Sequence, residues 1–108
     1  MRLKHLRLVK RIEEQKEILE KSIVILHRPD KKNIELLSGY NPFLILSGHT
    51  HNGQTWPINF ITRMQYGKYH NGYNKVKNTH TFTTSGFGTS GMPCRFLNPP
   101  EIVFIHLE

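Results

Sequence analysis

Residues 42–54 read P-F-L-I-L-S-G-H-T-H-N-G-Q, and the fold predicted for the chain rests mainly on this segment. It begins with a short apolar run, which is typical of a strand buried on both faces. It ends in two histidines, His49 and His51. Side chains at positions i and i+2 of an extended backbone point to the same side, so we expect the two imidazoles to project together. Two imidazoles on one side form half of a transition-metal site.

A second apolar run, residues 22–26 (S-I-V-I-L), ends in His27. Between the two runs, Asn33 is predicted to be the N-cap of a short helix that stops at Gly39. Strand, short helix and strand form a βαβ unit, in which the two strands are parallel. Open α/β sheets bind their ligands at the carboxyl edge of the strands. We therefore expect His27 to meet the two later histidines at that edge.

The rest of the chain completes an α/β fold of about four strands with two helices. Apolar residues at helical spacing predict a helix over residues 1–21. Residues 48–78 are rich in glycine and asparagine, and they are predicted to be mostly loop. Residues 79–84 are rich in β-branched side chains and predict the third strand. Residues 101–107 (E-I-V-F-I-H-L) predict the fourth strand.

The composition limits the classes of protein that the chain can belong to. With 15 Lys and Arg against 8 Asp and Glu in 108 residues, its formal charge of +7 favours anionic partners. It contains no run of about 18 apolar residues and no secretory signal. Cys94 is the one cysteine, which fits a reducing compartment. We therefore expect a cytoplasmic protein, and the basic N-terminal helix offers peripheral contact with a membrane surface.

Four segments together resemble the C-terminal half of the calcineurin-like metallophosphoesterases. They are residues 25–30 (I-L-H-R-P-D), 47–54 (S-G-H-T-H-N-G-Q), 86–96 (G-F-G-T-S-G-M-P-C-R-F) and 98–102 (N-P-P-E-I). The G-H-x-H motif is the most specific of them. The two later segments resemble a bacterial subgroup of small phosphodiesterases and lipid-A-precursor pyrophosphatases. The resemblance implies that residues 1–108 form the C-terminal part of a four-layer α/β/β/α sandwich.

The resemblance also implies a site that holds two divalent metal ions. His27 and His49 would ligate one ion, His51 would ligate the other, and Arg95 would contact the substrate. In this family a water or hydroxide between the ions attacks phosphorus, because the ions lower the pKa of water and stabilise charge on the oxygens. Imidazole ligands suit Mn, Fe, Co, Ni or Zn. The implied substrate is a phosphorylated small molecule or a lipid head group.

The family's first three motifs, D-x-H, G-D-x-x-D and G-N-H-[DE], do not occur in this chain. They would supply the carboxylate and amide ligands and the histidine that acts as an acid. Three imidazoles do not complete two metal coordination spheres. We therefore assign no catalytic residue and expect a truncated segment: a gene fragment, a split-gene product or a degraded copy. Such a segment would be inactive unless a complementing N-terminal chain supplied the other ligands.

Three other interpretations remain open from the residues alone. Residues 56–77 interleave aromatic and basic side chains, as in a non-catalytic module that binds nucleic acid or anionic lipid. A loop that flanks the substrate is favoured over nucleic-acid binding.

Residues 86–91 match the dinucleotide pattern G-x-G-x-x-G, but the prolines that follow oppose the helix that a dinucleotide site needs. These glycines instead predict a tight positive-φ loop beside the metal edge. The third interpretation is a non-functional remnant of an enzyme, which would expose an apolar sheet face.

Overall fold

The computed structural model describes residues 16–108, so most of the helix predicted over residues 1–21 lies outside the described part. The described end of that helix is α2, Lys16–Leu19. The elements that follow are β1 (Ile23–Leu26), α3 (Lys31–Ser38), β2 (Leu44–Ser47), η1 (His51–Gly53), α4 (Asn59–Tyr66), η2 (Gly67–His70), β3 (Gly72–Val76) and β4 (Thr79–Thr83).

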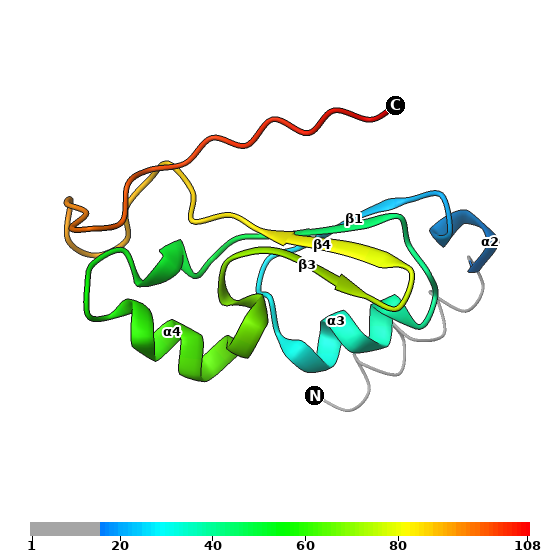
Figure 1. Cartoon of the computed structure of the whole chain (residues 1–108), viewed down its shortest axis with the longest axis horizontal. Helices are drawn as coiled ribbons and strands as arrows, with labels where there is room; N and C mark the ends of the chain where they lie inside the picture. Colours follow the sequence, from blue (N-terminus) through cyan, green and yellow to red (C-terminus); the bar gives the residue numbers. More distant parts are fainter. Residues whose placement is uncertain (1–15) are drawn as a thin grey trace.

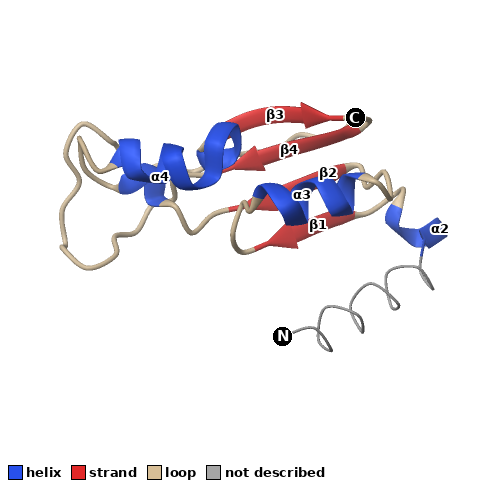
Figure 2. Cartoon of the chain, turned by 90° about the horizontal axis from the view of Figure 1, so that it is seen from below, coloured by secondary structure: helices blue, strands red, loops and turns tan. Residues whose placement is uncertain are grey.

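The strands form one sheet in the order β1-β2-β4-β3 (Figure 2). The predicted βαβ unit is confirmed, because β1 and β2 are parallel neighbours and Leu26 pairs with Ser47 at their carboxyl ends. The third parallel strand, β4, lies on the other side of β2, and β3 joins it antiparallel at the edge. Three parallel strands therefore end at one edge of the sheet.

The crossover helix α3 begins three residues earlier than the sequence predicts. Asp30, not Asn33, occupies the N-cap position, and its carbonyl accepts the first helical bond from the Ile34 amide at 3.0 Å. The Asn33 side chain instead donates to the Asp30 carboxylate at 3.4 Å. The helix stops at Gly39 as predicted, where the Gly39 amide donates to the Glu35 and Leu36 carbonyls. These hydrogen bonds give partners to carbonyl groups at the C-terminal end of the helix.

One face of the sheet is covered by α3 and η2, and the core lies there. Ile34 of α3, Ile45 of β2 and Tyr69 of η2 are 1%, 0% and 2% exposed, and they pack together. In Figure 1, α3 and α4 lie on the same side of the sheet. The buried apolar core of the described residues is therefore small and one-sided.

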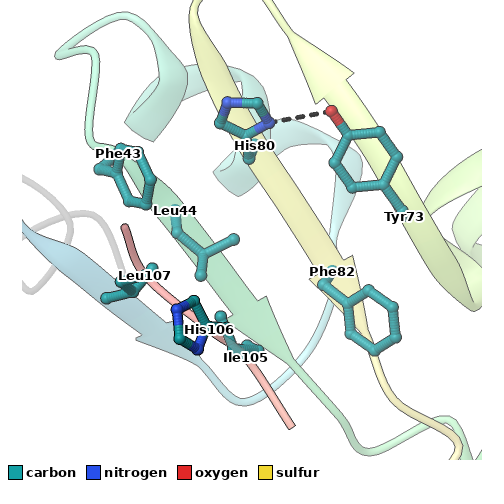
Figure 3. A pocket seen from close by; sticks show the side chains of 8 residues that line it. All are labelled: Phe43, Leu44, Tyr73, His80, Phe82, Ile105, His106 and Leu107. Carbon is teal, nitrogen blue, oxygen red and sulfur yellow. Dashed lines mark hydrogen bonds between the residues drawn. The ribbon is translucent and has the colours of Figure 1, made fainter. Parts of the chain in front are cut away.

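The other face of the sheet is open apart from the C-terminal segment, residues 101–108, which crosses it (Figure 1). An apolar pocket lies between this segment and strands β2, β3 and β4, as Figure 3 shows. Its lining residues are Phe43, Leu44, Tyr73, His80, Phe82, Ile105, His106 and Leu107. Ile25 on this face is 83% exposed, and Phe104 in the segment is 93% exposed. The segment leaves much apolar surface uncovered.

The prediction of a fourth strand over residues 101–107 is wrong, because this segment pairs with no strand in the described structure. Both edges of β4 are already occupied, by β2 and β3, so the chain that follows β4 cannot extend the sheet beside it. Glu101 fixes the start of the segment, since its carboxylate accepts hydrogen bonds from the Thr84 hydroxyl (2.8 Å) and the Ser85 amide (3.0 Å). The strand that completes the sheet is β3.

The prediction that residues 48–78 are mostly loop is also wrong, because they contain η1, α4, η2 and β3. The sequence did not predict α4, because most of its apolar residues do not face the core: Ile61 and Met64 are 61% and 86% exposed, and Tyr66 alone is buried. The strand β3 contains Gly72 and Asn74, which disfavour strands. Pairing along its whole length with β4 overrides that preference.

The fold class is α/β, as predicted: a four-stranded mixed sheet with helices packed on one face. Among the helices of residues 16–108, none is both long enough and apolar enough to cross a membrane.

Candidate metal centre

His27 and His49 meet at the carboxyl edge of the sheet. His27 directly follows β1 and His49 lies two residues after β2, and these strands end side by side. The amide of Gly48 donates to the carbonyl of His27 at 3.3 Å, which joins the two chain segments beyond the strands. The imidazole ring centroids are 4.7 Å apart in an edge-to-face arrangement. The predicted meeting of histidines at this edge is therefore confirmed for this pair.

The surroundings of His49 lower its pKa. Burial lowers the pKa of His49 below its ordinary value of 6.5, and the positive charge of Arg28 lowers it further. His27 and His51 act in the same direction, and Asp30 opposes them. Neutral imidazole is the form that binds a metal ion, so the site favours the binding form near neutral pH.

The backbone that carries His49 and His51 is not extended, so the expected i, i+2 geometry is wrong. The φ angles are +69° at His49, +48° at His51 and +48° at Asn52, all in the left-handed region. This region costs non-glycine residues roughly 1–2 kcal/mol each. The chain turns here because η1 starts at His51. Surrounding hydrogen bonds must therefore hold the turn in this conformation.

Thr50, between the two histidines, fixes the turn from inside the protein. Its side chain is buried, and its hydroxyl donates to the carbonyl of His70 in η2 at 2.8 Å. The same hydroxyl oxygen accepts from the amide of Asn52 at 3.2 Å. The middle residue of the G-H-T-H motif thus ties the turn to η2, and its neighbours remain free for other contacts.

Asn98 holds the same turn from the late part of the chain. Its side chain is buried, and its amide nitrogen donates to the carbonyls of His51 (2.7 Å) and Asn52 (2.9 Å). Sequence reasoning placed Asn98 in the N-P-P-E-I segment but gave it no role. The two prolines after it were an available signal, because they stiffen a loop that could hold a buried polar side chain in place.

Arg95 lies beside His51, where its guanidinium joins several segments. Its Nη2 donates to the carbonyls of Ser85 (2.8 Å) and Gly88 (2.6 Å) and lies 3.4 Å from Nδ1 of His51. Its Nη1 donates to the carbonyl of Asn98 at 3.4 Å. The predicted substrate residue is therefore next to a predicted ligand, and it also holds the loop around it together.

The glycine-rich loop, residues 86–91, forms the outer wall of the centre. Gly86 and Gly91 have φ angles of +74° and +76°, which confirms the predicted positive-φ loop, and no helix follows them within residues 86–100. The dinucleotide interpretation is therefore excluded. Gln54 fastens this loop, because its side-chain oxygen accepts from the Ser90 amide at 2.5 Å. Its amide nitrogen also donates to the carbonyls of Met92 and Cys94 just after the loop, both at 2.7 Å.

The donor set at this edge fits part of a metal coordination sphere. The paired imidazoles of His27 and His49 suit two ligands of one transition-metal ion, and both side chains are exposed at the edge. His51 lies near enough to affect the pKa of His49, but its Nδ1 faces Arg95. Within residues 16–108, no three His, Cys, Asp or Glu side chains are grouped closely enough to hold an ion. Further ligands would have to complete the sphere.

Sequence comparison finds relatives among bacterial and animal proteins. The chain is 37% identical over 87 residues to an uncharacterized metallophosphoesterase of Campylobacter jejuni, and the match covers 81% of this chain and 23% of that protein. It is 37% identical over 90 residues to the uncharacterized metallophosphoesterase YkuE of Bacillus subtilis, covering 81% of this chain and 31% of that protein.

A zebrafish (Danio rerio) relative named transmembrane protein with metallophosphoesterase domain is 30% identical over 86 residues, covering 80% of this chain and 20% of that protein. No protein-family model matches the chain, and no solved structure matches it significantly. The homologous region includes most of this chain, although the chain spans only about a quarter of the length of the bacterial relatives. By homology, this chain is related to the metallophosphoesterase family.

Proposed function

We propose that this chain carries part of the active site of a metal-dependent phosphoester hydrolase. His27, His49 and His51 are the proposed metal ligands, and the ions are two divalent cations from among Mn, Fe, Zn, Co and Ni. The observation that supports the proposal most directly is the 4.7 Å separation of the His27 and His49 rings at the ends of two parallel strands. The homology to metallophosphoesterases supports the same chemistry.

The metal ions, when bound, would supply a nucleophilic hydroxide and stabilise charge on the phosphate oxygens. The residues of this chain hold and orient the site. Asn98 and Thr50 hold the turn that carries the histidines. Arg95 uses one Nη1 hydrogen on the Asn98 carbonyl, and we propose that the other Nη1 hydrogen contacts the phosphate of a small molecule or a lipid head group.

We further propose that the open sheet face is completed by a second sheet, which gives the four-layer sandwich expected from the resemblance. The apolar exposure of Ile25 and Phe104 supports this arrangement, since buried sheet faces are apolar. The segment that supplies this sheet would carry the D-x-H, G-D-x-x-D and G-N-H motifs, in a cytoplasmic protein. Hydrolysis would then require both parts.

Metal titration of the untagged 108-residue chain tests the ligand assignment. We expect Mn²⁺ or Zn²⁺ binding by isothermal titration calorimetry, and at least a ten-fold loss of affinity in the His49→Ala/His51→Ala variant. His106→Ala is the matched control, because the side chain of His106 is exposed and lies in the C-terminal segment. Equal affinity in the double variant and the control would contradict the assignment, provided that circular dichroism shows all three chains folded.

Hydrolysis of bis(p-nitrophenyl) phosphate tests the need for a second part. We expect no metal-dependent hydrolysis by the chain alone. We expect activity when it is co-expressed with a segment that carries the three other motifs. Activity of the chain alone, at a rate that the His49→Ala/His51→Ala variant lacks, would show that this chain completes the site by itself.

A further inference from the structure

The helix α4 and the turn before it expose an apolar surface beside the candidate metal centre. We call this surface the α4 patch, and it consists of Trp56, Ile58, Phe60, Ile61 and Met64. Their exposed fractions are 54%, 44%, 53%, 61% and 86%. Five large apolar side chains within nine residues of chain exceed the scattered apolar exposure that is normal on a protein surface.

The α4 patch is joined rigidly to the candidate centre. Gly53, the last residue of η1, packs so closely on α4 that a Cβ atom there would overlap the Asn59 backbone. At the other end of α4, the ring of Tyr66 lies 6.4 Å from the ring of His49 in an edge-to-face arrangement. A partner surface that binds the α4 patch would therefore also lie close to the carboxyl edge of the sheet, where the histidines of the candidate centre are.

The acidic and basic side chains differ sharply in number in this part of the chain, because every formally charged residue there is positive. No aspartate or glutamate occurs between Glu35 and Glu101. The cations of the same stretch are Arg63, Lys68, Lys75, Lys77 and Arg95. Arg63 and Lys68, which lie within and just after α4, are exposed. An apolar helix face flanked by exposed cations complements a surface that is apolar below and negatively charged above.

We infer that the α4 patch docks onto an anionic lipid bilayer. Ile61 and Met64 enter the acyl boundary, and Trp56 lies at the level of the head groups, where amphipathic aromatic rings are favoured. Arg63 and Lys68 contact lipid phosphates. The centre at His49 then lies near the head groups, because the ring of Tyr66 in α4 lies beside the ring of His49.

The side chains of the patch favour lipid over single-stranded nucleic acid. Nucleic-acid platforms stack bases on aromatic rings. Three of the five patch residues, Ile58, Ile61 and Met64, are aliphatic or thioether side chains, and Met64 is the most exposed of the five. Hydrocarbon chains bury such side chains, and bases do not stack on them.

Vesicle binding of the full chain tests the docking, with Trp56 as the probe because it is the one tryptophan of the chain. EDTA is present throughout, so that metal binding cannot affect the result. We expect a blue shift of Trp56 emission and co-sedimentation with phosphatidylcholine vesicles that contain 30% phosphatidylglycerol. Pure phosphatidylcholine vesicles should bind at least ten-fold more weakly, and raised salt should weaken anionic binding.

The variant Ile61→Ser/Met64→Ser should lower the partition onto anionic vesicles by at least ten-fold. Both side chains are exposed, so we expect the fold to be retained. The matched control is Ile25→Ser/Phe104→Ser, which removes two apolar side chains that are even more exposed, from the open sheet face and from the C-terminal segment over it. This control should bind the vesicles as the wild-type chain does.

Several results would overturn the docking. They are unchanged vesicle binding by the α4 variant, equal losses in the control, salt-sensitive quenching of Trp56 by oligo(dT) without vesicle binding, and a dimer abolished by the α4 substitutions without vesicle binding. Failure of the metal titration would overturn the proposed function and leave the docking to be decided by the vesicles.

Discussion

The two faces of the sheet carry similar apolar side chains but differ in what packs on them. On the covered face, Ile45 is completely buried against Ile34 and Tyr69. On the open face, Ile25, only one strand away in the same sheet, is 83% exposed. The comparison shows that a continuous apolar run in a strand indicates that both faces of the strand can be buried. What buries that face depends on other segments.

The largest difference between the faces is expected from truncation of isoleucine. Ile45→Ala should lower the free energy of unfolding by about 2–5 kcal/mol, because it leaves a cavity in the core. Ile25→Ala should change it by no more than about 0.5 kcal/mol, because the side chain is already in water. Urea unfolding followed by circular dichroism measures both. A large loss in Ile25→Ala would mean that the open face is packed in solution.

A smaller effect is expected where the C-terminal segment is fixed to the open face. Glu101→Ala removes the carboxylate that accepts from Thr84 and Ser85, and it should cost about 1.5–3 kcal/mol of unfolding free energy. Hydrogen exchange of the Ser85 amide should also become faster. Glu108→Ala is the control, because its side chain is 94% exposed and should contribute little. Equal stability of the two variants would show that the segment is held by other contacts.

The smallest expected effect is a pH dependence of the free energy of unfolding, caused by His70 of η2 on the covered face. Burial lowers the pKa of His70 below its ordinary value of 6.5, and Arg63 lowers it further. The unfolded chain therefore binds more protons than the folded chain just below pH 6.5. The free energy of unfolding is consequently highest above that pH and decreases as the pH falls. His70→Gln should flatten this part of the stability curve. Arg63→Gln should raise the pKa of His70 measured by NMR, and an unchanged pKa would contradict the assigned cause.

Much of the βαβ unit was predictable because its signals are local. The apolar runs at β1 and β2 are flanked by Pro29 and Gly39, which limit the helix between them. A parallel pair then brings the residues after the strands to one edge, and the 4.7 Å approach of His27 and His49 follows. The α/β class and the edge position of these two histidines required no other part of the chain.

The missed elements depend on contacts between distant residues. Within β3, Asn74 and Lys75 have no strong strand preference, and pairing with β4 makes this segment a strand. The left-handed turn at His51 is held by Asn98, which lies far along the chain. Apart from Tyr66, the apolar residues of α4 face outward, so periodicity gave no indication of a core-facing helix. The local sequence of each of these segments was therefore not enough to predict its structure.

The βαβ unit, with His27 and His49 at its carboxyl edge, follows from local sequence signals, because apolar runs, helix boundaries and strand ends are properties of neighbouring residues. The turn at His51, the outward face of α4 and the unpaired course of residues 101–107 follow instead from contacts made in the folded chain. Each of these depends on which hydrogen-bond partners and sheet edges remain free once the rest of the chain has folded.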